Sequence, residues 1–470
     1  MPVPTRALPA AASPEAFPAD RDFPQLALAH DPALMLDVFR AHLKPVAGRP
    51  YHIEDCKPFR FRCRQSTSRC VLQYTLRLVD PSSGRSWDQW VTGLLYARDG
   101  EAKRLWREMR VGDPRREIPE RWLTFEPVDF IPDLDMVVQV FPYDRKLRQL
   151  SRVMDGALRD LEPLLLRRLE PGHWRVAERT IEPTRYRTEL GAALRYTLQV
   201  HDGPTPGRRT LRGYLKVYRD DRGQRTFEML RSLAEQTANG RRPYATIQPL
   251  GYWPELRTVA LEEAPGITLQ QLLLHGGDPT PALRAVGRAV AAFNQDDLGL
   301  TRRTPLADQL EDLGLASTLV QWACPAARAD VQAITAAVVA GLADEPPAPI
   351  HGDLKTDHIF VSGDRVVFID LDSAALGDPV RDPAHLFAYV AGGVGLDAMP
   401  PEQARAAAAA FAEEYFRHVP ASWRRRFALH CAGALIEVAS GIFRRQDARW
   451  PDKMAVAIEG ARYALAEGVG

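Results

Sequence analysis

Apolar and polar positions largely alternate in two neighbouring segments near the middle of the chain. These segments are LRYTLQV (194–200) and GYLKVY (213–218), and their pattern is that of strands with one buried face. Apolar residues at helical spacing follow in TFEMLRSLAEQ (226–236), and two further strand-like segments lie at 244–253 and 258–263. This order predicts a small antiparallel sheet with one helix packed on it.

The same arrangement occurs twice in the chain. VLQYTLRLVD (71–80) aligns without gaps on ALRYTLQVHD (193–202), and five of the ten pairs are identical. The same offset of 122 positions carries EPVDFIPDLDMVV (126–138) onto QPLGYWPELRTVA (248–260). An unchanged offset across both segments argues against chance similarity and predicts a duplicated module.

Helical spacing dominates the rest of the chain. Residues 145–170 show it and are followed by Pro171-Gly172, which predicts a linking helix. After residue 265 the pattern is again helical, except for a proline-rich break at 345–355 and a predicted hairpin, IFVSGDRVVFIDLD (359–372). We therefore predict five regions: a disordered lead-in (1–24), a first sheet unit (25–144), a linking helix (145–172), a second sheet unit (173–262) and a helical lobe (263–470).

Composition and charge narrow the functional classes. The chain has 470 residues, a net charge of +1 and a pI near 7.7, so its overall field favours neither nucleic acid nor an acidic membrane surface. Its beginning lacks the apolar core of a signal peptide, and its longest apolar stretches are shorter than a bilayer span or carry charges. Five cysteines, an odd number, do not make a disulfide framework. We therefore expect a cytoplasmic protein that acts through a local site.

The segment HGDLKTDHIFVSGDRVVFIDLDS (351–373) carries the residue types that phosphoryl transfer requires. That chemistry needs a carboxylate to position the acceptor hydroxyl and take its proton. It also needs ligands for the metal ions that bridge the phosphates, and a cation near the transferring group. Asp353, Asp370 and Lys355 can fill these roles from two adjacent loops, and the predicted hairpin would fix their separation.

The order HGDLK, hairpin, IDLD and GDPxxD resembles the catalytic segment of the aminoglycoside phosphotransferase and choline kinase superfamily, relatives of protein kinases. The resemblance implies a bilobal α+β fold of the protein-kinase type, preceded here by an additional N-lobe-like α+β domain. It implies that Asp353 is the catalytic base, Lys355 a contact to the transferring phosphate and His351 a support for the loop. It further implies that Asp370 is a metal ligand, that Asp382 is a buried brace, and that the cofactors are ATP and Mg²⁺.

One position departs from the family pattern. The family usually has Asn five residues after the catalytic aspartate, as a ligand for the second metal ion, whereas this chain has His358. Imidazole is a poorer ligand for Mg²⁺ than for softer ions, so the two-metal arrangement stays open and Mn²⁺ is an alternative. His358 can bind metal, contact Asp370 or the phosphates, or simply pack, and Asp372 can supply the missing carboxylate.

The second unit supplies the remaining nucleotide contacts. Lys216 lies inside an apolar strand pattern, where its ammonium group needs a partner unless it reaches water from an edge strand. By the resemblance this partner is Glu228, with Glu235 as the alternative, and the pair would orient the α- and β-phosphates. The turn with Gly191 would cover the phosphates, and the backbone from Glu262 to Ala264 would hold adenine.

The first unit lacks these charged residues. At the constant offset Leu94 stands in place of Lys216 and Trp106 in place of the helix glutamate, and a local slip of two residues would substitute Tyr96 for Leu94. The first unit is therefore predicted to bind no ATP productively, and to cover the active site, contribute substrate contacts or mediate self-association. Its segment RFRCRQSTSRC (60–70) is basic enough to attract a phosphate, although a solvated turn is the simpler interpretation.

The acceptor is predicted to be a small molecule. The segment between Asp370 and Asp382 is too short for the platform on which protein kinases bind peptides. The resemblance therefore points to a hydroxylated metabolite such as a sugar, an aminoglycoside or an amino alcohol. The helical lobe has no clean acidic run to suit a polycation, which favours a neutral polyol. A catalytically weak pseudokinase that binds nucleotide as a regulatory protein is the competing interpretation.

Overall fold

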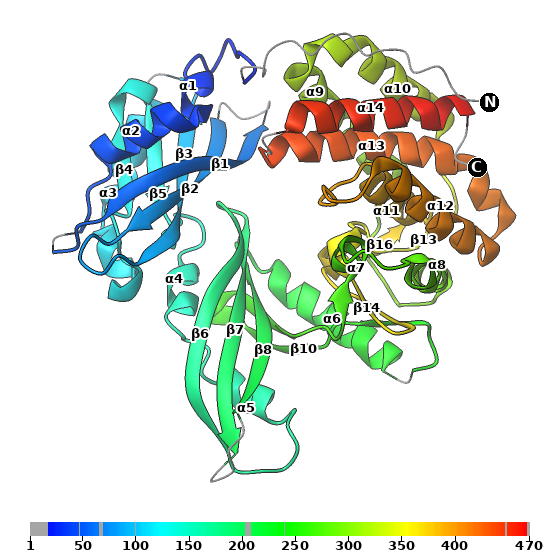
Figure 1. The fold of residues 1–470 in the computed structure, drawn as a ribbon, viewed down its shortest axis with the longest axis horizontal. Coiled ribbons are helices and arrows are strands. Elements are labelled where there is room, and N and C mark those ends of the chain that lie inside the picture. Colours follow the sequence, from blue (N-terminus) through cyan, green and yellow to red (C-terminus); the bar gives the residue numbers. More distant parts are fainter. Residues whose placement is uncertain are drawn as a thin grey trace.

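Two sheet units and a helical lobe make up the molecule (Figure 1). The computed structural model describes residues 17–46, 48–64, 69–98, 100–202, 208–238, 240–446 and 449–467. The predicted disordered lead-in therefore lies mostly outside the described residues. Its described part contradicts the prediction, because Phe17 and Phe23 are buried in the hydrophobic core. Their aromatic side chains give this segment apolar area to bury, which a disordered lead-in would lack.

The first unit is a five-stranded antiparallel sheet with helices on both faces. Tyr74 faces helix α2, where its ring meets Phe39, whereas Val71 and Leu94 share a separate apolar cluster with helix α3. Strand alternation explains this division between the two faces. The elements, with strands in their order across the sheet, are β1 (His52–Arg64), β2 (Arg69–Val79), β3 (Ser86–Tyr96), β5 (Met136–Val140) and β4 (Val128–Ile131), helices α1 (Leu26–His30), α2 (Pro32–His42) and α3 (Glu101–Arg110), and the 3-10 turns η1 (Pro114–Glu117), η2 (Glu120–Trp122) and η3 (Pro132–Leu134).

The second unit repeats this design with the same order of strands. Helix α6 turns Thr226, Leu230 and Leu233 inward, at the spacing of one helical face. The strand β9 (Tyr244–Thr246) leaves the unit and pairs in parallel with a strand of the helical lobe. The other elements are β6 (Trp174–Arg187), β7 (Gly191–Asp202), β8 (Arg208–Tyr218), β11 (Thr258–Glu262), β10 (Pro249–Trp253), helix α6 (Arg222–Thr237) and the turn η4 (Pro254–Leu256).

Strand register confirms the offset that the sequence repeat predicted. Leu94 pairs with Val71 and Val137, and Lys216 pairs with Ala193 and Val259. Asp135 and Arg257, at the same offset, both adopt the left-handed backbone conformation, with φ of 41° and 45°. Leu94 therefore occupies the position of Lys216, and the slipped alignment through Tyr96 is wrong.

The linking segment forms two short helices, where one helix was predicted. These are α4 (Gln149–Met154) and α5 (Leu161–Leu166). Gly156 interrupts them with φ of 84°, a conformation that a helix does not tolerate. Leu150 and Leu161 are fully buried in the apolar cluster of the second unit. The segment is therefore part of the second unit's core as well as a connection.

The helical lobe contains the predicted hairpin among its helices. Strands β14 (Ile359–Ser362) and β15 (Arg365–Phe368) pair around Gly363, which has φ of 60°. The remaining elements are β12 (Ile267–Thr268), β13 (Ala348–Ile350), β16 (Ala375–Gly377), α7 (Leu269–Leu274), α8 (Thr280–Gln295), α9 (Leu306–Ala323), α10 (Arg328–Gly341), α11 (Arg381–Ala391), α12 (Pro401–Arg417), α13 (Phe427–Arg444), α14 (Trp450–Glu467), and the turns η5 (Pro325–Ala327), η6 (Thr356–His358), η7 (Leu371–Ser373) and η8 (Ala421–Arg426).

An aromatic cluster joins the first unit to the helical lobe. Phe61 of β1 stacks on Trp322 of α9, with ring centroids 5.7 Å apart, and meets the edge of Phe443 of α13 at 5.5 Å. Phe17 closes the cluster at 5.4 Å from Phe443. Buried aromatic pairs of this kind stabilise an interface beyond their area. The first unit is therefore anchored on the helical lobe, next to the second unit (Figure 1).

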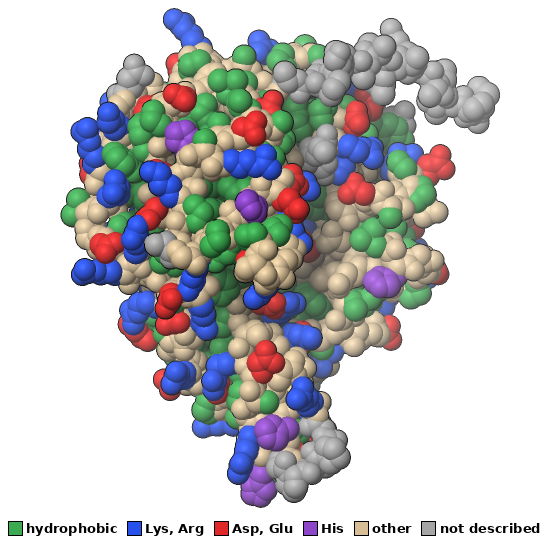
Figure 2. Space-filling view, turned by 60° about the vertical axis from the view of Figure 1, so that its left-hand side comes forward, with side chains coloured by type: hydrophobic (Ala, Val, Ile, Leu, Met, Phe, Trp, Pro, Cys, Tyr) green, Lys and Arg blue, Asp and Glu red, His purple; other side chains and the backbone are tan. Residues whose placement is uncertain are grey.

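One helical stretch among the described residues, Ala421–Arg444, is long and apolar enough to cross a membrane by length and composition. It lies inside the helical lobe, where 78% of its most apolar window is buried. A core helix of a folded lobe accounts for this composition. Over the face shown in Figure 2, Lys and Arg side chains are interspersed with Asp and Glu.

Candidate active site

The loop that follows β13 is held in one conformation by three contacts. Gly352 has φ of 78°, and a Cβ atom there would lie 2.6 Å from the carbonyl oxygen of Ser373, so only glycine fits. The carboxylate of Asp382, on α11, accepts hydrogen bonds from the backbone N–H groups of His351 (2.6 Å) and Gly352 (3.0 Å). The ring of His351 is bonded to the carbonyl of Ile369 at 2.8 Å. The predicted brace and support thus contact the loop directly.

This loop presents Asp353 as an ionised carboxylate. Lys355 Nζ donates to its Oδ2 at 3.0 Å. Burial would raise the pKa of Asp353, but the charge of Lys355 lowers the pKa below its ordinary value. The group is therefore ready to accept a hydrogen bond, and then a proton, from a hydroxyl.

Asp353, His358 and Asp370 form a cluster that could hold a metal ion. One potential ligand atom from each lies within 4.8 Å of the others. His358 Nδ1 is 2.9 Å from the carbonyl oxygen of Asp353, and its Nε2 is 3.1 Å from Asp370 Oδ2. The three groups come from η6, the loop before it and the end of β15, so the hairpin brings them together.

The donors and acceptors of this cluster fit a shared cation. Burial, followed by the charge of Lys355, lowers the pKa of His358 to about 4, so its ring is neutral at neutral pH. A backbone carbonyl can only accept, so the single N–H of the ring lies on Nδ1 and Nε2 carries a lone pair. That lone pair faces a carboxylate oxygen at 3.1 Å. Adjacent ligands of an octahedral Mg²⁺ ion are about 3 Å apart, which matches this separation.

Asp370 occupies a strained backbone position at the end of the hairpin. Its φ of 60° places it in the left-handed region, which aspartate adopts at some cost. Its Oδ1 accepts a hydrogen bond from Lys216 Nζ at 2.5 Å, and Arg185 lies 3.7 Å from its Oδ2. Burial opposes ionisation, but the ammonium group of Lys216 lowers the pKa of Asp370 well below its usual range.

Lys216 pairs with the two aspartates of the helical lobe. Its ammonium also donates to Asp372 Oδ1 at 2.8 Å, and the hydroxyl of Tyr218 donates to the other oxygen of Asp372 at 3.0 Å. Burial would lower the pKa of Lys216, but Asp372 and Asp370 raise it above its ordinary value. The second unit and the helical lobe are therefore joined by a half-buried ion-pair cluster.

The predicted partners of Lys216 in helix α6 are wrong for this structure. Glu228 is exposed and accepts a hydrogen bond from Gln224 at 3.0 Å. Glu235 is also exposed and lies 4.0 Å from Arg231. Because α6 turns Thr226 and Leu230 inward, the glutamates fall on its outer face.

The turn between β6 and β7, which was predicted to cover the phosphates, is docked on the first unit. Glu189 is buried and forms ion pairs with Arg69 (2.7 Å) and Arg145. Thr188 shares a hydrogen bond of 2.7 Å with Thr92. At Gly191 a Cβ atom would lie 2.9 Å from a backbone carbonyl of β8, so the strand pair requires a glycine there.

The predicted hinge connects β11 to the helical lobe. The side chain of Glu262 accepts a hydrogen bond from the backbone N–H of Gln248 at 3.2 Å and pairs with Arg168. Ala264 is buried. The structure therefore places these two residues between the lobes, apart from the cluster of carboxylates.

Sequence reasoning missed three residues at the site. Arg185 reaches Asp370, Tyr218 bonds Asp372, and His385 Nδ1 is 2.7 Å from the carbonyl of Leu354 in the catalytic loop. The sequence did contain an indication for Tyr218, because it lies two residues after Lys216 and therefore on the same face of β8. It also contained one for Arg185, which alternates with the buried Tyr186 along β6.

The two-lobed fold and the clustered carboxylates define a kinase-like phosphotransferase. The model of the phosphotransferase enzyme family matches residues 175–429, more than half of the chain. The chain therefore belongs to the phosphotransferase enzyme family and acts on a hydroxyl group of its acceptor. The match begins at β6, so the first unit lies outside it.

Solved structures to which the chain is similar include three kinases. Amicoumacin kinase hAmiN, in complex with AMP-PNP, Ca²⁺ and Ami, is 13% identical over 66% of this chain and 95% of its own, with a TM-score of 0.42. An ADP-bound aminoglycoside phosphotransferase is 14% identical over 64% and 97%, with a TM-score of 0.39. The ethanolamine kinase of Plasmodium vivax is 11% identical over 63% and 85%, with a TM-score of 0.39. No curated protein sequence matches the chain.

Proposed function

We propose that this protein transfers the γ-phosphate of ATP to a hydroxyl group of a small metabolite, with Asp353 as the catalytic base. The observation that carries the proposal is the convergence of Asp353, His358 and Asp370 within 4.8 Å, with lysines from both lobes beside them. A base, metal ligands and cations in one place are what phosphoryl transfer requires.

Each residue has a separate task in the proposed reaction. The ionised carboxylate of Asp353 accepts the proton of the acceptor hydroxyl as that oxygen attacks phosphorus. Lys355, 3.0 Å from Asp353, holds the carboxylate in place and lies beside the transferring group. Lys216 orients the phosphates. To do so, its ammonium group gives up one aspartate oxygen and donates a hydrogen bond to a phosphate oxygen instead. The segment around Glu262 and Ala264 holds adenine.

A divalent ion is the expected cofactor. The family resemblance implies Mg²⁺, and Mn²⁺ is the alternative because the imidazole of His358 is a better ligand for softer ions. Asp370 and His358 are the proposed ligands, with Asp372 available for a second ion. When bound, the ion would neutralise charge on the phosphates. The ligands themselves are held by Asp382, which fixes the loop, and by the hairpin. We place the protein in the cytoplasm, and self-association through the first unit stays a prediction.

Metal-dependent phosphoryl transfer tests the proposal. Full-length protein would be assayed with ATP and a panel of hydroxylated metabolites, first with Mg²⁺ and then with Mn²⁺. We expect Asp370→Asn to lower the rate by about two to four decades, because it removes a charged ligand of the ion that would neutralise the phosphates. Asp364→Asn is the matched control, since Asp364 is exposed at the tip of the same hairpin. The proposal fails if the wild type transfers phosphate to no member of the panel with either ion.

A nucleotide-binding regulatory protein is the second candidate. The observation that favours it is that Lys216 is held by Asp370 and Asp372, while Glu228 faces solvent. Such a protein would bind MgADP with the same affinity in the wild type and in Asp353→Asn, and neither form would transfer phosphate. Turnover by the wild type excludes this candidate.

A further inference from the structure

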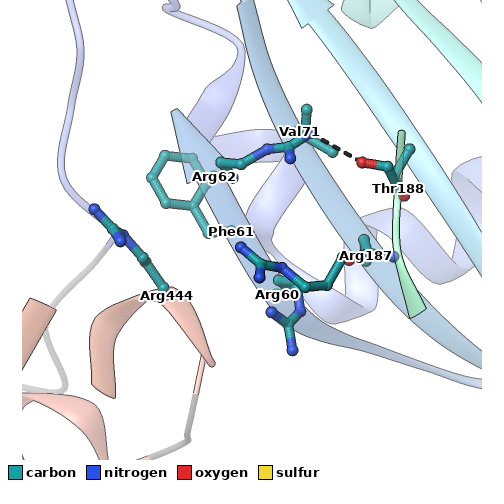
Figure 3. A pocket seen from close by; sticks show the side chains of 8 residues that line it. Arg60, Phe61, Arg62, Val71, Arg187, Thr188 and Arg444 are labelled. Carbon is teal, nitrogen blue, oxygen red and sulfur yellow. Dashed lines mark hydrogen bonds between the residues drawn. The ribbon is translucent and has the colours of Figure 1, made fainter. Parts of the chain in front are cut away.

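A basic hollow lies where the first unit, the second unit and the helical lobe meet (Figure 3). Arg60 and Arg62 of β1, Arg187 at the end of β6 and Arg444 at the end of α13 line it. Its cavity volume is about 70 Å³. This volume is below the roughly 300–1,000 Å³ of a whole small-molecule site, so the hollow has room for one anionic group rather than for a whole metabolite. We call it the arginine hollow.

Strand geometry explains how the first unit contributes two of these arginines. Arg60 and Arg62 are two residues apart on β1 and therefore share a face, and they pair with Gln73 and Val71 of β2. Phe61 between them belongs to the aromatic cluster with the helical lobe. The same short segment thus anchors the first unit on the helical lobe and supplies two positive charges to the hollow. On the outer surface shown in Figure 2, by contrast, positive and negative side chains are mixed.

Carboxylates compensate the arginines of the hollow only from a distance, Asp353 and Asp370 for Arg187 and Asp312 and Glu437 for Arg444. Within the described ranges, Arg60, Arg187 and Arg444 form no ion pair with a carboxylate, and Nε of Arg60 is buried without a hydrogen-bond partner. Burial lowers the pKa of Arg60 to about 10, and Arg185 and Arg187 contribute further. A buried cation is costly unless an anion neutralises it. An anionic ligand would supply the missing charge.

The arginine hollow adjoins the catalytic carboxylate. Arg185, two residues before Arg187 on the same face of β6, lies 3.7 Å from Asp370 Oδ2. Arg187 is therefore two residues along the strand from an arginine that reaches the catalytic cluster. Lys216 and Lys355 already stand beside Asp370 and Asp353, where they can meet the phosphates of the nucleotide. The acceptor, which must reach Asp353 with its hydroxyl, is the better occupant of the hollow.

We propose that the arginine hollow binds an anionic group of the acceptor, so that the substrate is a hydroxylated metabolite bearing a phosphate monoester or a carboxylate. Guanidinium groups bind both anions through paired, charge-assisted hydrogen bonds. The inference rests on the proposed function and replaces the neutral polyol that the sequence favoured. The first unit then forms part of the acceptor site, with Arg60 and Arg62 as its contribution.

Binding of inorganic phosphate tests the hollow without turnover. Calorimetric titrations of full-length wild type, Arg60→Ala, Arg444→Gln and the control Arg405→Ala would be compared, since Arg405 is an exposed arginine on α12. We expect the first two variants to weaken phosphate binding about 10- to 100-fold, and Arg405→Ala to leave it unchanged. Arg444 is exposed, so its variant keeps the test valid if Arg60→Ala fails to fold. Unchanged phosphate binding in both variants overturns the proposal.

MgADP binding and phosphoryl transfer to matched acceptors separate the two possible occupants. Each neutral polyol in the panel is paired with its phosphate monoester and with its carboxylate derivative. We expect anionic members to be preferred, and Arg60→Ala to raise their KM about 10- to 100-fold while leaving MgADP affinity unchanged. Equal loss of MgADP and phosphate binding overturns the inference in favour of a nucleotide site, and so does a preference for neutral members. Absence of MgADP binding and of all transfer by the wild type instead defeats the proposed function, and the acceptor assignment with it.

Discussion

The two sheet units have the same order of strands and the same paired positions, yet only the second has a charged residue at the strand position that faces the catalytic hairpin. At equivalent places in β3 and β8, Leu94 is buried among apolar side chains, whereas Lys216 is bonded to Asp370 and Asp372. The same strand position belongs to the hydrophobic core in the first unit and to the active site in the second. The fold of the unit therefore does not by itself determine the chemistry.

Their surroundings explain why each residue suits its unit. The second unit lies against the catalytic hairpin, whose carboxylates balance a buried ammonium group. Position 94 contacts α3 and β5, which offer Leu105, Val137 and other apolar groups. The first unit instead holds the β6–β7 turn through Arg69, with Arg145 of the linking segment beside it, so this charge acts outside its own sheet.

Making the second unit resemble the first removes its chemistry. We expect Lys216→Leu to lower phosphoryl transfer by roughly a thousandfold, because a preorganised charge is lost and two half-buried aspartates lose their partner. Steady-state kinetics with saturating ATP measure the effect. Lys57→Leu, at an exposed lysine of β1, is the control, and a rate within threefold of wild type for Lys216→Leu would contradict the account.

The reverse change tests the apolar side of the comparison. Leu94→Lys puts an ammonium group into an apolar cluster, and we expect a loss of about 3–4 kcal/mol in the free energy of unfolding. Urea denaturation measures it. Leu94→Met should cost less than about 1.5 kcal/mol because it conserves volume. A stable Leu94→Lys protein would mean that the first unit has a site that the structure does not reveal.

The contact between the units should depend on pH through Glu189. Burial would raise the pKa of this group, but Arg69 and Arg145 lower it from 4.5 to about 2. A lowered folded-state pKa stabilises the protein above pH 4.5, and this stabilisation is lost as the pH falls toward 2. We expect Glu189→Gln to cost roughly 2–3 kcal/mol at pH 7. The difference from wild type in urea denaturation should shrink to roughly half or less at pH 3, and a pH-independent difference would exclude this ion pair as its source.

The smallest effect is expected at the helix position where the units differ by Trp106 and Glu228. Because Glu228 is exposed, Glu228→Ala should change the free energy of unfolding by less than about 0.5 kcal/mol. The rate of transfer should stay within a factor of about three. A loss of tenfold or more would show that Glu228 pairs with Lys216 during turnover, as the family resemblance implies.

Local patterns predicted much of the fold and of the catalytic segment. The repeat offset gave the strand register, and the HGDLK and IDLD segments identified carboxylates that the structure brings together. These features depend on residues that are close in sequence or fixed by one hairpin. The linking helix was wrong because one glycine with positive φ outweighs the helical pattern around it.

Contacts between segments that are far apart in the chain could not be predicted from the sequence. The partner of Lys216 depends on which face of α6 turns inward, and the arginine hollow depends on β1, β6 and α13 meeting in space. The basic segment at 60–70 and the arginines after Phe443 were both visible as sequence patterns. Nothing local to either segment indicates that they share a cavity.

The central claim is that Asp353 is the base of a phosphotransferase whose nucleotide contacts lie elsewhere. The most direct test measures phosphoryl transfer and MgADP affinity together in wild type and in Asp353→Asn. We predict that transfer falls by about two to four decades while the affinity for MgADP stays within a factor of about three. Equal rates of transfer in the two proteins would contradict the account.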